Sequence, residues 1–156
     1  MFLKLIELTI VIVGLGFTVY FSYRTSRVAV KQFTIEYLER FAEKVAKNRK
    51  ILRTYLPKEM QERCRIEPEA VTRVWADDNA RNATKSYLNA YNRSARDILE
   101  GNVDRGLALA AQRRNVVTAY MRFSYLIEMR RAEGRKSWLS LERFYHRYGD
   151  AQLLEE

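Results

Sequence analysis

The sequence has very little cysteine, histidine, proline or glycine. Its 156 residues include one cysteine, Cys64, and one histidine, His146, together with two prolines and six glycines. One cysteine excludes an internal disulfide, and one cysteine with one histidine cannot form a zinc cluster. We therefore expect no metal and no cofactor. Long stretches lack a helix breaker, and no segment keeps a strand-like alternation, so the composition predicts an all-α protein.

Motifs of common enzyme classes are also missing from the sequence. There is no glycine-rich phosphate loop, no dinucleotide-binding fingerprint and no serine nucleophile elbow. The sequence therefore names no reaction, and we favour a protein that is not an enzyme.

Positive charge is what the chain has in excess. There are 28 Lys and Arg against 19 Asp and Glu, a net charge of +9. The excess lies mainly in residues 23–56, which hold nine basic and three acidic residues. A basic segment of this kind is typical of contact with anionic lipid headgroups, and RNA is a less favoured partner because the tyrosines follow apolar stripes.

Residues 1–23 are predicted to form a transmembrane signal anchor. The nineteen residues from Leu5 to Tyr23 carry only one charge, and a helix of this length at ~1.5 Å per residue just crosses a ~30 Å hydrocarbon core. A cleaved signal peptide and a buried core helix are the alternatives. The residues taken to face the lipid are Leu5, Leu8, Val11, Val13, Phe17 and Tyr20.

The orientation of this anchor follows from its flanking charges. Arg24, Arg27 and Lys31 come after the segment, whereas Lys4 precedes it. By the positive-inside rule the C-terminal part would lie in the cytoplasm of a bacterium, held by a single pass through the inner membrane. The three cations would then contact the membrane surface.

Residues 24–56 are predicted to continue the anchor as a basic helical stalk. No glycine or proline occurs between Gly16 and Pro57, so one helix can run through the whole segment. Apolar positions recur at alternating spacings of three and four, which is typical of a coiled-coil seam. Two readings stay open: the seam joins copies of the chain into a homo-oligomer, or it packs on later helices of the same chain. The seam residues are Leu38, Phe41, Val45, Asn48, Leu52 and Tyr55.

Residues 57–156 are predicted to form a cytoplasmic helical domain, giving a bundle of about four helices. One helix would run from Glu69 to Gly101, with a break somewhere in the polar stretch 76–86. Another would start at Asp104 as its cap and reach about Arg131, and a short one would follow Ser137.

Arg143 and His146 are the only candidates for catalysis. Three residues apart, they share one face of the last predicted helix. Ribonucleases of the HEPN type use an arginine and a histidine on one helix, where histidine transfers a proton and arginine stabilises phosphate charge. Their usual spacing is longer than the two residues that intervene here. An ordinary surface pair is the favoured alternative.

The stretch 87–149 resembles a family of small, mostly membrane-anchored bacterial proteins of unknown function. The similar features are ILEGNVD, FSYLIEMRR and the segment from Trp138 to Glu142. In architecture, the chain also resembles the membrane accessory protein of type VI-B CRISPR systems. That resemblance implies a HEPN-like helical domain and assembly into a ring-shaped pore.

Three functions are consistent with these observations. The favoured one is a membrane-anchored, non-enzymatic oligomeric accessory or pore-forming protein in antiviral, CRISPR-associated defence. The second is a membrane-tethered scaffold or adaptor that recruits a protein partner. The third is a HEPN-like ribonuclease acting through Arg143 and His146.

Overall fold

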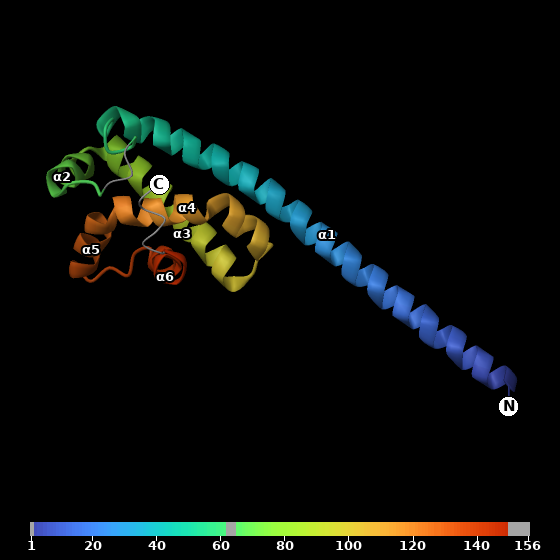
Figure 1. The fold of residues 1–156 in the computed structure, drawn as a ribbon. Helices are drawn as coiled ribbons and strands as arrows, with labels where there is room; N and C mark the ends of the chain where they lie inside the picture. The colour runs from blue at the N-terminus through green and yellow to red at the C-terminus, as the bar shows by residue number, and fades with distance from the viewer. Residues whose placement is uncertain (1, 62–64, 150–156) are drawn as a thin grey trace.

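The computed structural model describes residues 2–61 and 65–149, with side chains from residue 12 onward, and the regular elements within them are all helices (Figure 1). The all-α prediction is confirmed. The helices are α1 (Phe2–Tyr55), α2 (Pro68–Ala76), α3 (Asp78–Glu100), α4 (Arg105–Arg122), α5 (Ser124–Ala132) and α6 (Leu139–Tyr148).

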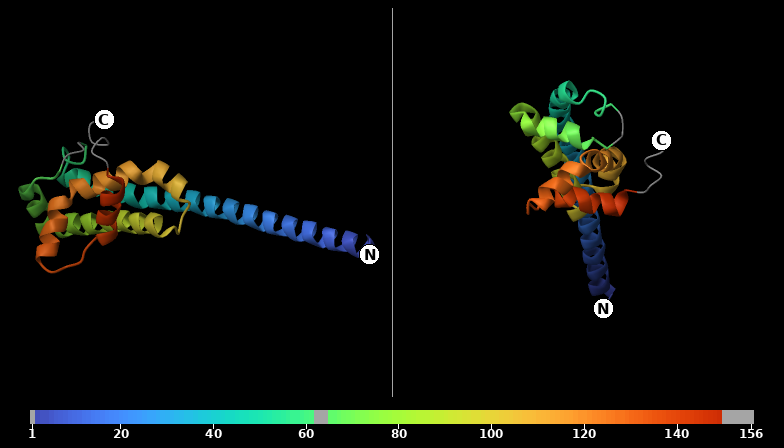
Figure 2. Two further views of the ribbon diagram at one scale, coloured as in Figure 1. Left: turned by 60° about the horizontal axis from the view of Figure 1, so that its bottom comes forward. Right: turned by 90° about the vertical axis from the view of Figure 1, so that its left-hand side faces the viewer.

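Helix α1 has 54 residues and is therefore about 80 Å long. Its C-terminal half packs on the other helices, while its N-terminal half projects from the domain as an isolated rod (Figures 1 and 2). The helix ends at Tyr55, two residues before Pro57, where the proline ring disfavours helical backbone for the residue before it.

The predicted transmembrane anchor is wrong. Among the residues whose side chains are described, no helix is both long enough and apolar enough to cross a bilayer. Of the residues taken to face the lipid, Val13, Phe17 and Tyr20 lie in the described part of α1, whereas Leu5, Leu8 and Val11 lie outside the described side chains.

Two further expectations depended on that span. The single pass through the inner membrane is wrong for the same reason, and the cytoplasmic placement of the C-terminal domain loses its basis. The contact of Arg24, Arg27 and Lys31 with anionic headgroups stays a prediction. In the structure these three cations lie on the exposed part of α1.

Helix α3 lies at the centre of the domain and packs against α1, α2, α4 and α6. Its apolar side is buried along its full length. The predicted helix 69–101 is two helices because Asp77 accepts a 2.8 Å hydrogen bond from the backbone N–H of Ala80 and so caps α3. At the other end Gly101 adopts a positive φ of 79°, which closes the helix without the strain that a side chain would add.

The predicted helix from Asp104 to Arg131 is also interrupted. Asp104 does cap α4, since its carboxylate accepts from the Leu107 N–H at 3.0 Å. The break comes at Phe123, where α4 ends and α5 begins. The carbonyl of Arg122 accepts a 2.9 Å hydrogen bond from the N–H of Ile66. This is a tertiary contact, so the local sequence pattern does not predict the break.

Helix α6 starts one residue later than the expected Ser137 cap. Trp138 occupies the capping position with a φ of 57°, and no side chain of its own caps the helix. Two asparagines of α3 hold this start instead. Asn89 accepts from the Trp138 indole N–H at 2.8 Å, and Asn92 accepts from the Leu141 backbone N–H at 3.0 Å.

The predicted seam in the stalk packs within the chain. Phe41, Val45 and Leu52 are buried in the hydrophobic core of the domain, and the Phe41 ring meets Tyr91 of α3 edge to face at 5.2 Å. Leu38 and Asn48 are half-buried, and Tyr55 is exposed at the end of the helix. The structure thus favours the second reading of this seam, in which it serves the fold of one chain.

Candidate interaction surfaces on the long helix

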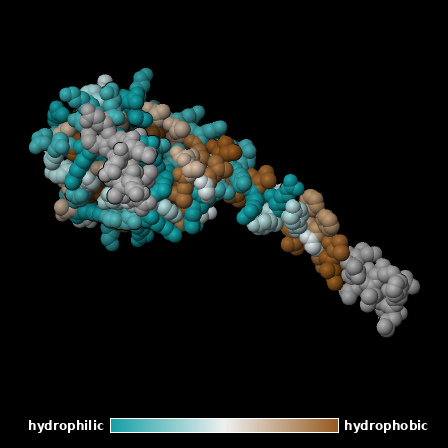
Figure 3. All heavy atoms as spheres, in the orientation of Figure 1, coloured by the Kyte–Doolittle hydropathy of each residue, from teal (hydrophilic) through white to brown (hydrophobic). Residues whose placement is uncertain are grey.

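The projecting part of α1 exposes many large apolar side chains, which appear as brown patches along the rod (Figure 3). One set of them, called here the α1 stripe, follows alternating spacings of four and three and contains no charged residue. Its large members Ile12, Val19, Tyr23, Val30 and Phe33 are 45% to 67% exposed. Its full membership is Ile12, Gly16, Val19, Tyr23, Ser26, Val30, Phe33 and Tyr37.

Basic residues border the α1 stripe on one side. Arg24, Arg27 and Lys31 lie about a quarter turn around the helix from it, as expected from 3.6 residues per turn. The guanidinium carbon of Arg27 is 5.0 Å from the ring centroid of Tyr23, which is a cation–π distance. The α1 stripe is therefore an uncharged strip of helix surface with basic side chains along one side.

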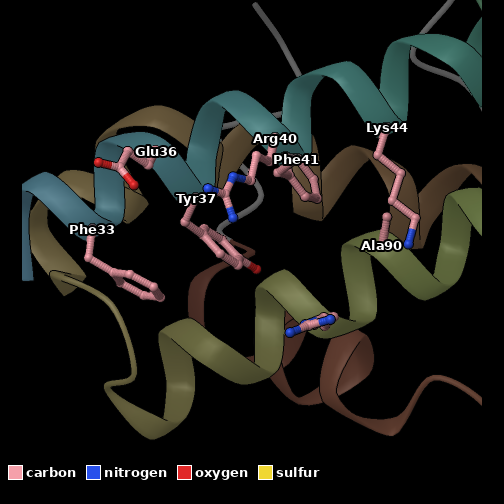
Figure 4. A pocket seen from close by; sticks show the side chains of 8 residues that line it. Phe33, Glu36, Tyr37, Arg40, Phe41, Lys44 and Ala90 are labelled. Carbon is pink, nitrogen blue, oxygen red and sulfur yellow. The ribbon is translucent and has the colours of Figure 1, made fainter.

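The α1 stripe ends in a groove between α1 and α3 (Figure 4). The groove has a volume of about 330 Å³, and Phe33, Tyr37 and Phe41 line it together with Arg40 and Lys44. Figure 4 shows the Phe33 and Tyr37 rings directed from α1 toward α3. Because Phe33 and Tyr37 belong to both features, the stripe and the groove form one continuous surface.

Tyr37 is held as a neutral phenol in this groove. Burial raises its pKa to about 12, and the nearby carboxylate of Asp97 contributes in the same direction. The side chain therefore offers an apolar ring with a protonated hydroxyl at physiological pH.

The predicted catalytic pair lies elsewhere. Arg143 is exposed on α6, and the His146 side chain is 68% exposed, with its Nε2 3.8 Å from Oε1 of Glu142. Glu142 is already engaged by Arg131 in a bidentate contact, with 2.5 Å between Nη2 and Oε2. Neither Arg143 nor His146 lines the α1–α3 groove, and neither is in a position shielded from water.

Metal ligands do not cluster in the described part of the chain. Within it, no group of three or more His, Cys, Asp or Glu side chains is placed to hold a metal ion. Cys64 lies outside the described residues.

A family described as a domain of unknown function, DUF4760, matches residues 5–148. The chain belongs to this family. The match confirms the resemblance to a family of unknown function and extends it from residues 87–149 to almost the whole length of the chain, α1 included. No curated protein and no solved structure is significantly similar to this DUF4760 chain.

Sequence reasoning missed the α1 stripe. The sequence pattern assigns the uncharged run before Arg24 to a membrane and places the apolar seam only from Leu38 onward. The signal was nevertheless present, because the charge-free heptad pattern continues past Arg24 through Ser26 and Val30 to Tyr37.

Proposed function

We propose that this DUF4760 protein is a non-enzymatic assembly protein whose copies associate through the α1 stripe and present their helical domains to a protein partner. The observation that carries the proposal is the exposed, uncharged heptad pattern on a helix that projects from the domain. Contiguous apolar surface of this kind on a single chain marks an interaction site.

A second copy of the chain fits this surface better than an unrelated partner. Two α1 helices related by a twofold axis would bring the same stripe onto itself, so that apolar meets apolar along the whole contact. Gly16 and Ser26 are small and would let the helices approach closely. The basic residues Arg24, Arg27 and Lys31 would remain at the side, hydrated and outside the seam.

Two other functions receive less support. A HEPN-like ribonuclease would need Arg143 and His146 to meet their counterparts in a shared site, and both side chains lie on α6, away from the surface proposed for assembly. An accessory role in CRISPR-associated defence rests only on the architectural resemblance. CRISPR-associated defence is one process in which a non-enzymatic assembly protein could act.

The test is the mass of the full chain in solution, measured by light scattering after gel filtration. The wild type is expected to be an oligomer, and Val30→Asp is expected to dissociate it while leaving the helical content unchanged. Val28→Asp is the matched control, because Val28 is equally apolar and 62% exposed but lies off the stripe.

Three results would overturn the proposal. The first is a monomeric wild type, and the second is equal dissociation by Val28→Asp and Val30→Asp. The third is a chain that stays monomeric and instead co-floats with lipid vesicles through the same residues.

A further inference from the structure

A second groove lies on the other flank of α1, between its C-terminal half and helices α3 and α4. Its volume is about 570 Å³, within the usual range of small-molecule sites. Three of its lining residues are the cations Arg49, Lys50 and Arg53. Arg53 is four residues from Arg49 and three from Lys50, so the three cations gather on one side of α1.

The residues that line this groove include no acid. Besides the three cations, its polar lining is Tyr91 of α3 with Gln112 and Asn115 of α4. All three of these side chains are neutral and can donate a hydrogen bond. Burial raises the pKa of Tyr91, which keeps its hydroxyl protonated. The groove therefore combines positive charge with neutral donors.

Gln112 brings a buried amide group to the lining of this groove. Its side chain is only 7% exposed, yet among the described residues its Oε1 atom has no hydrogen-bond partner. A buried amide oxygen without a partner costs free energy, on the order of 1–3 kcal/mol. The oxygen and nitrogen of an amide can exchange places by a flip, so Gln112 can present either a donor or an acceptor to a molecule in the groove.

We propose that this groove binds a small anion carrying at least two phosphate groups, of the class of inorganic pyrophosphate or a nucleoside diphosphate. Arg49 and Arg53 would each bind phosphate oxygens through paired N–H donors, and Lys50 would add a point charge. The amides of Gln112 and Asn115 would bind from the floor of the groove.

Single-stranded RNA fits this groove less well. Binding of single strands relies on exposed aromatic rings on which bases stack. The aromatic rings that line this groove belong to Phe41 and Tyr91, which are 8% and 5% exposed. The site is independent of the α1 stripe, and no residue is shared between them.

The experiment is calorimetric titration of the full chain with inorganic pyrophosphate at physiological salt, which screens the general field of a protein with a net charge of +9. The wild type is expected to show saturable binding with one site per chain. The double variant Arg49→Gln/Arg53→Gln should bind at least tenfold more weakly. Arg143→Gln/Arg147→Gln removes the same charge from exposed positions on α6 and should bind within twofold of wild type.

A third variant tests the floor of the groove. Gln112→Leu keeps the approximate volume and removes the amide, so it should weaken pyrophosphate binding severalfold, with circular dichroism used to confirm the fold. Equal weakening by the two double variants would overturn the proposal, because it would show only general attraction of anions. Absence of saturable pyrophosphate binding would also overturn it, and so would binding of a single-stranded RNA but not pyrophosphate through Arg49 and Arg53.

Discussion

The backbone N–H of Asp104 donates a 2.8 Å hydrogen bond to the side-chain hydroxyl of Thr34, seventy residues away in the sequence. The same hydroxyl donates to the carbonyl of Val30 at 2.7 Å. Thr34 is fully buried, although its neighbours Phe33 and Ile35 are exposed. This bond therefore marks the point at which α1 leaves the domain, and it ties the helix to the loop that precedes α4.

Replacing Thr34 by valine should destabilise the domain. Valine has nearly the same shape, but it leaves the N–H of Asp104 without its acceptor in a poorly hydrated position. A buried donor that loses its partner costs about 1–3 kcal/mol, and this loss is expected in the free energy of unfolding measured with urea. Thr54→Val is the control, because Thr54 is exposed and bonds only within α1, so its effect should stay below about 0.5 kcal/mol.

The start of α6 depends on a side chain from α3. Asn92 accepts from the N–H of Leu141 and so replaces the cap that α6 lacks in its own sequence. Asn92→Ala should therefore lower the free energy of unfolding by about 1 kcal/mol, as the loss of an N-cap does. The exposed Asn82 of α3 provides the control variant Asn82→Ala. Equal effects of the two substitutions would show that Asn92 does not act as a cap.

These contacts show which parts of the fold were predictable. Asp104 and Gly101 act through residues close to them in the chain, so the sequence predicted both helix ends correctly. The break at Phe123 depends on a bond between Ile66 and Arg122, and the start of α6 depends on Asn92. Long-range bonds of this kind leave no local pattern.

The interaction surfaces were predicted less well, for a physical reason. A heptad pattern reveals that one face of a helix is apolar, but it doesn't reveal what covers that face. Phe41 and Val45 belong to the predicted oligomer seam, and the structure covers them with the chain's own domain. The basic groove was not predicted because Arg49 and Gln112 come together only when α4 packs against α1.

The stability of the domain should depend on pH through Glu142. The hydrogen bond from Arg131 lowers the pKa of this carboxyl group below its usual value. A lowered pKa in the folded state adds stability that is present above the unfolded value of about 4.3 and is lost as pH falls through the folded value. Glu142→Gln should therefore be about 1 kcal/mol less stable than wild type at pH 7, and the difference should shrink below about pH 4.

A neighbouring ion pair supplies the control for that measurement. Glu133 contacts Arg130 at 2.5 Å, but its side chain is 46% exposed, so Glu133→Gln should change stability by less than about 0.5 kcal/mol. Urea unfolding at several pH values separates the two variants. A difference between Glu142→Gln and wild type that does not change with pH would contradict the role given to this carboxylate.

His146 should be dispensable for the fold and should not support RNA cleavage. Its side chain is 68% exposed, and surface substitutions of this kind usually change stability by less than about 0.5 kcal/mol. We expect His146→Ala to unfold like wild type, and we expect neither protein to cleave a labelled single-stranded RNA without added metal. Cleavage by the wild type that disappears in His146→Ala, with the mass of the particle unchanged, would instead support the HEPN-like ribonuclease.

The same substitution should have different effects at Val45 and Val30: loss of the folded domain at Val45 and loss of the oligomer at Val30. Both are valines of α1, but Val45 is 8% exposed within the core, whereas Val30 is 45% exposed on the α1 stripe. Val45→Asp places a carboxylate among apolar side chains, and the cost of burying a polar or charged group there is several kcal/mol, enough to unfold a marginally stable domain. Val30→Asp leaves that core intact and should only separate the copies.

Circular dichroism and light scattering on both variants measure the two effects: loss of the folded domain in Val45→Asp, and a folded, smaller particle in Val30→Asp. If Val45→Asp were instead folded but dissociated, the contact between copies would lie in the seam from Leu38 to Tyr55.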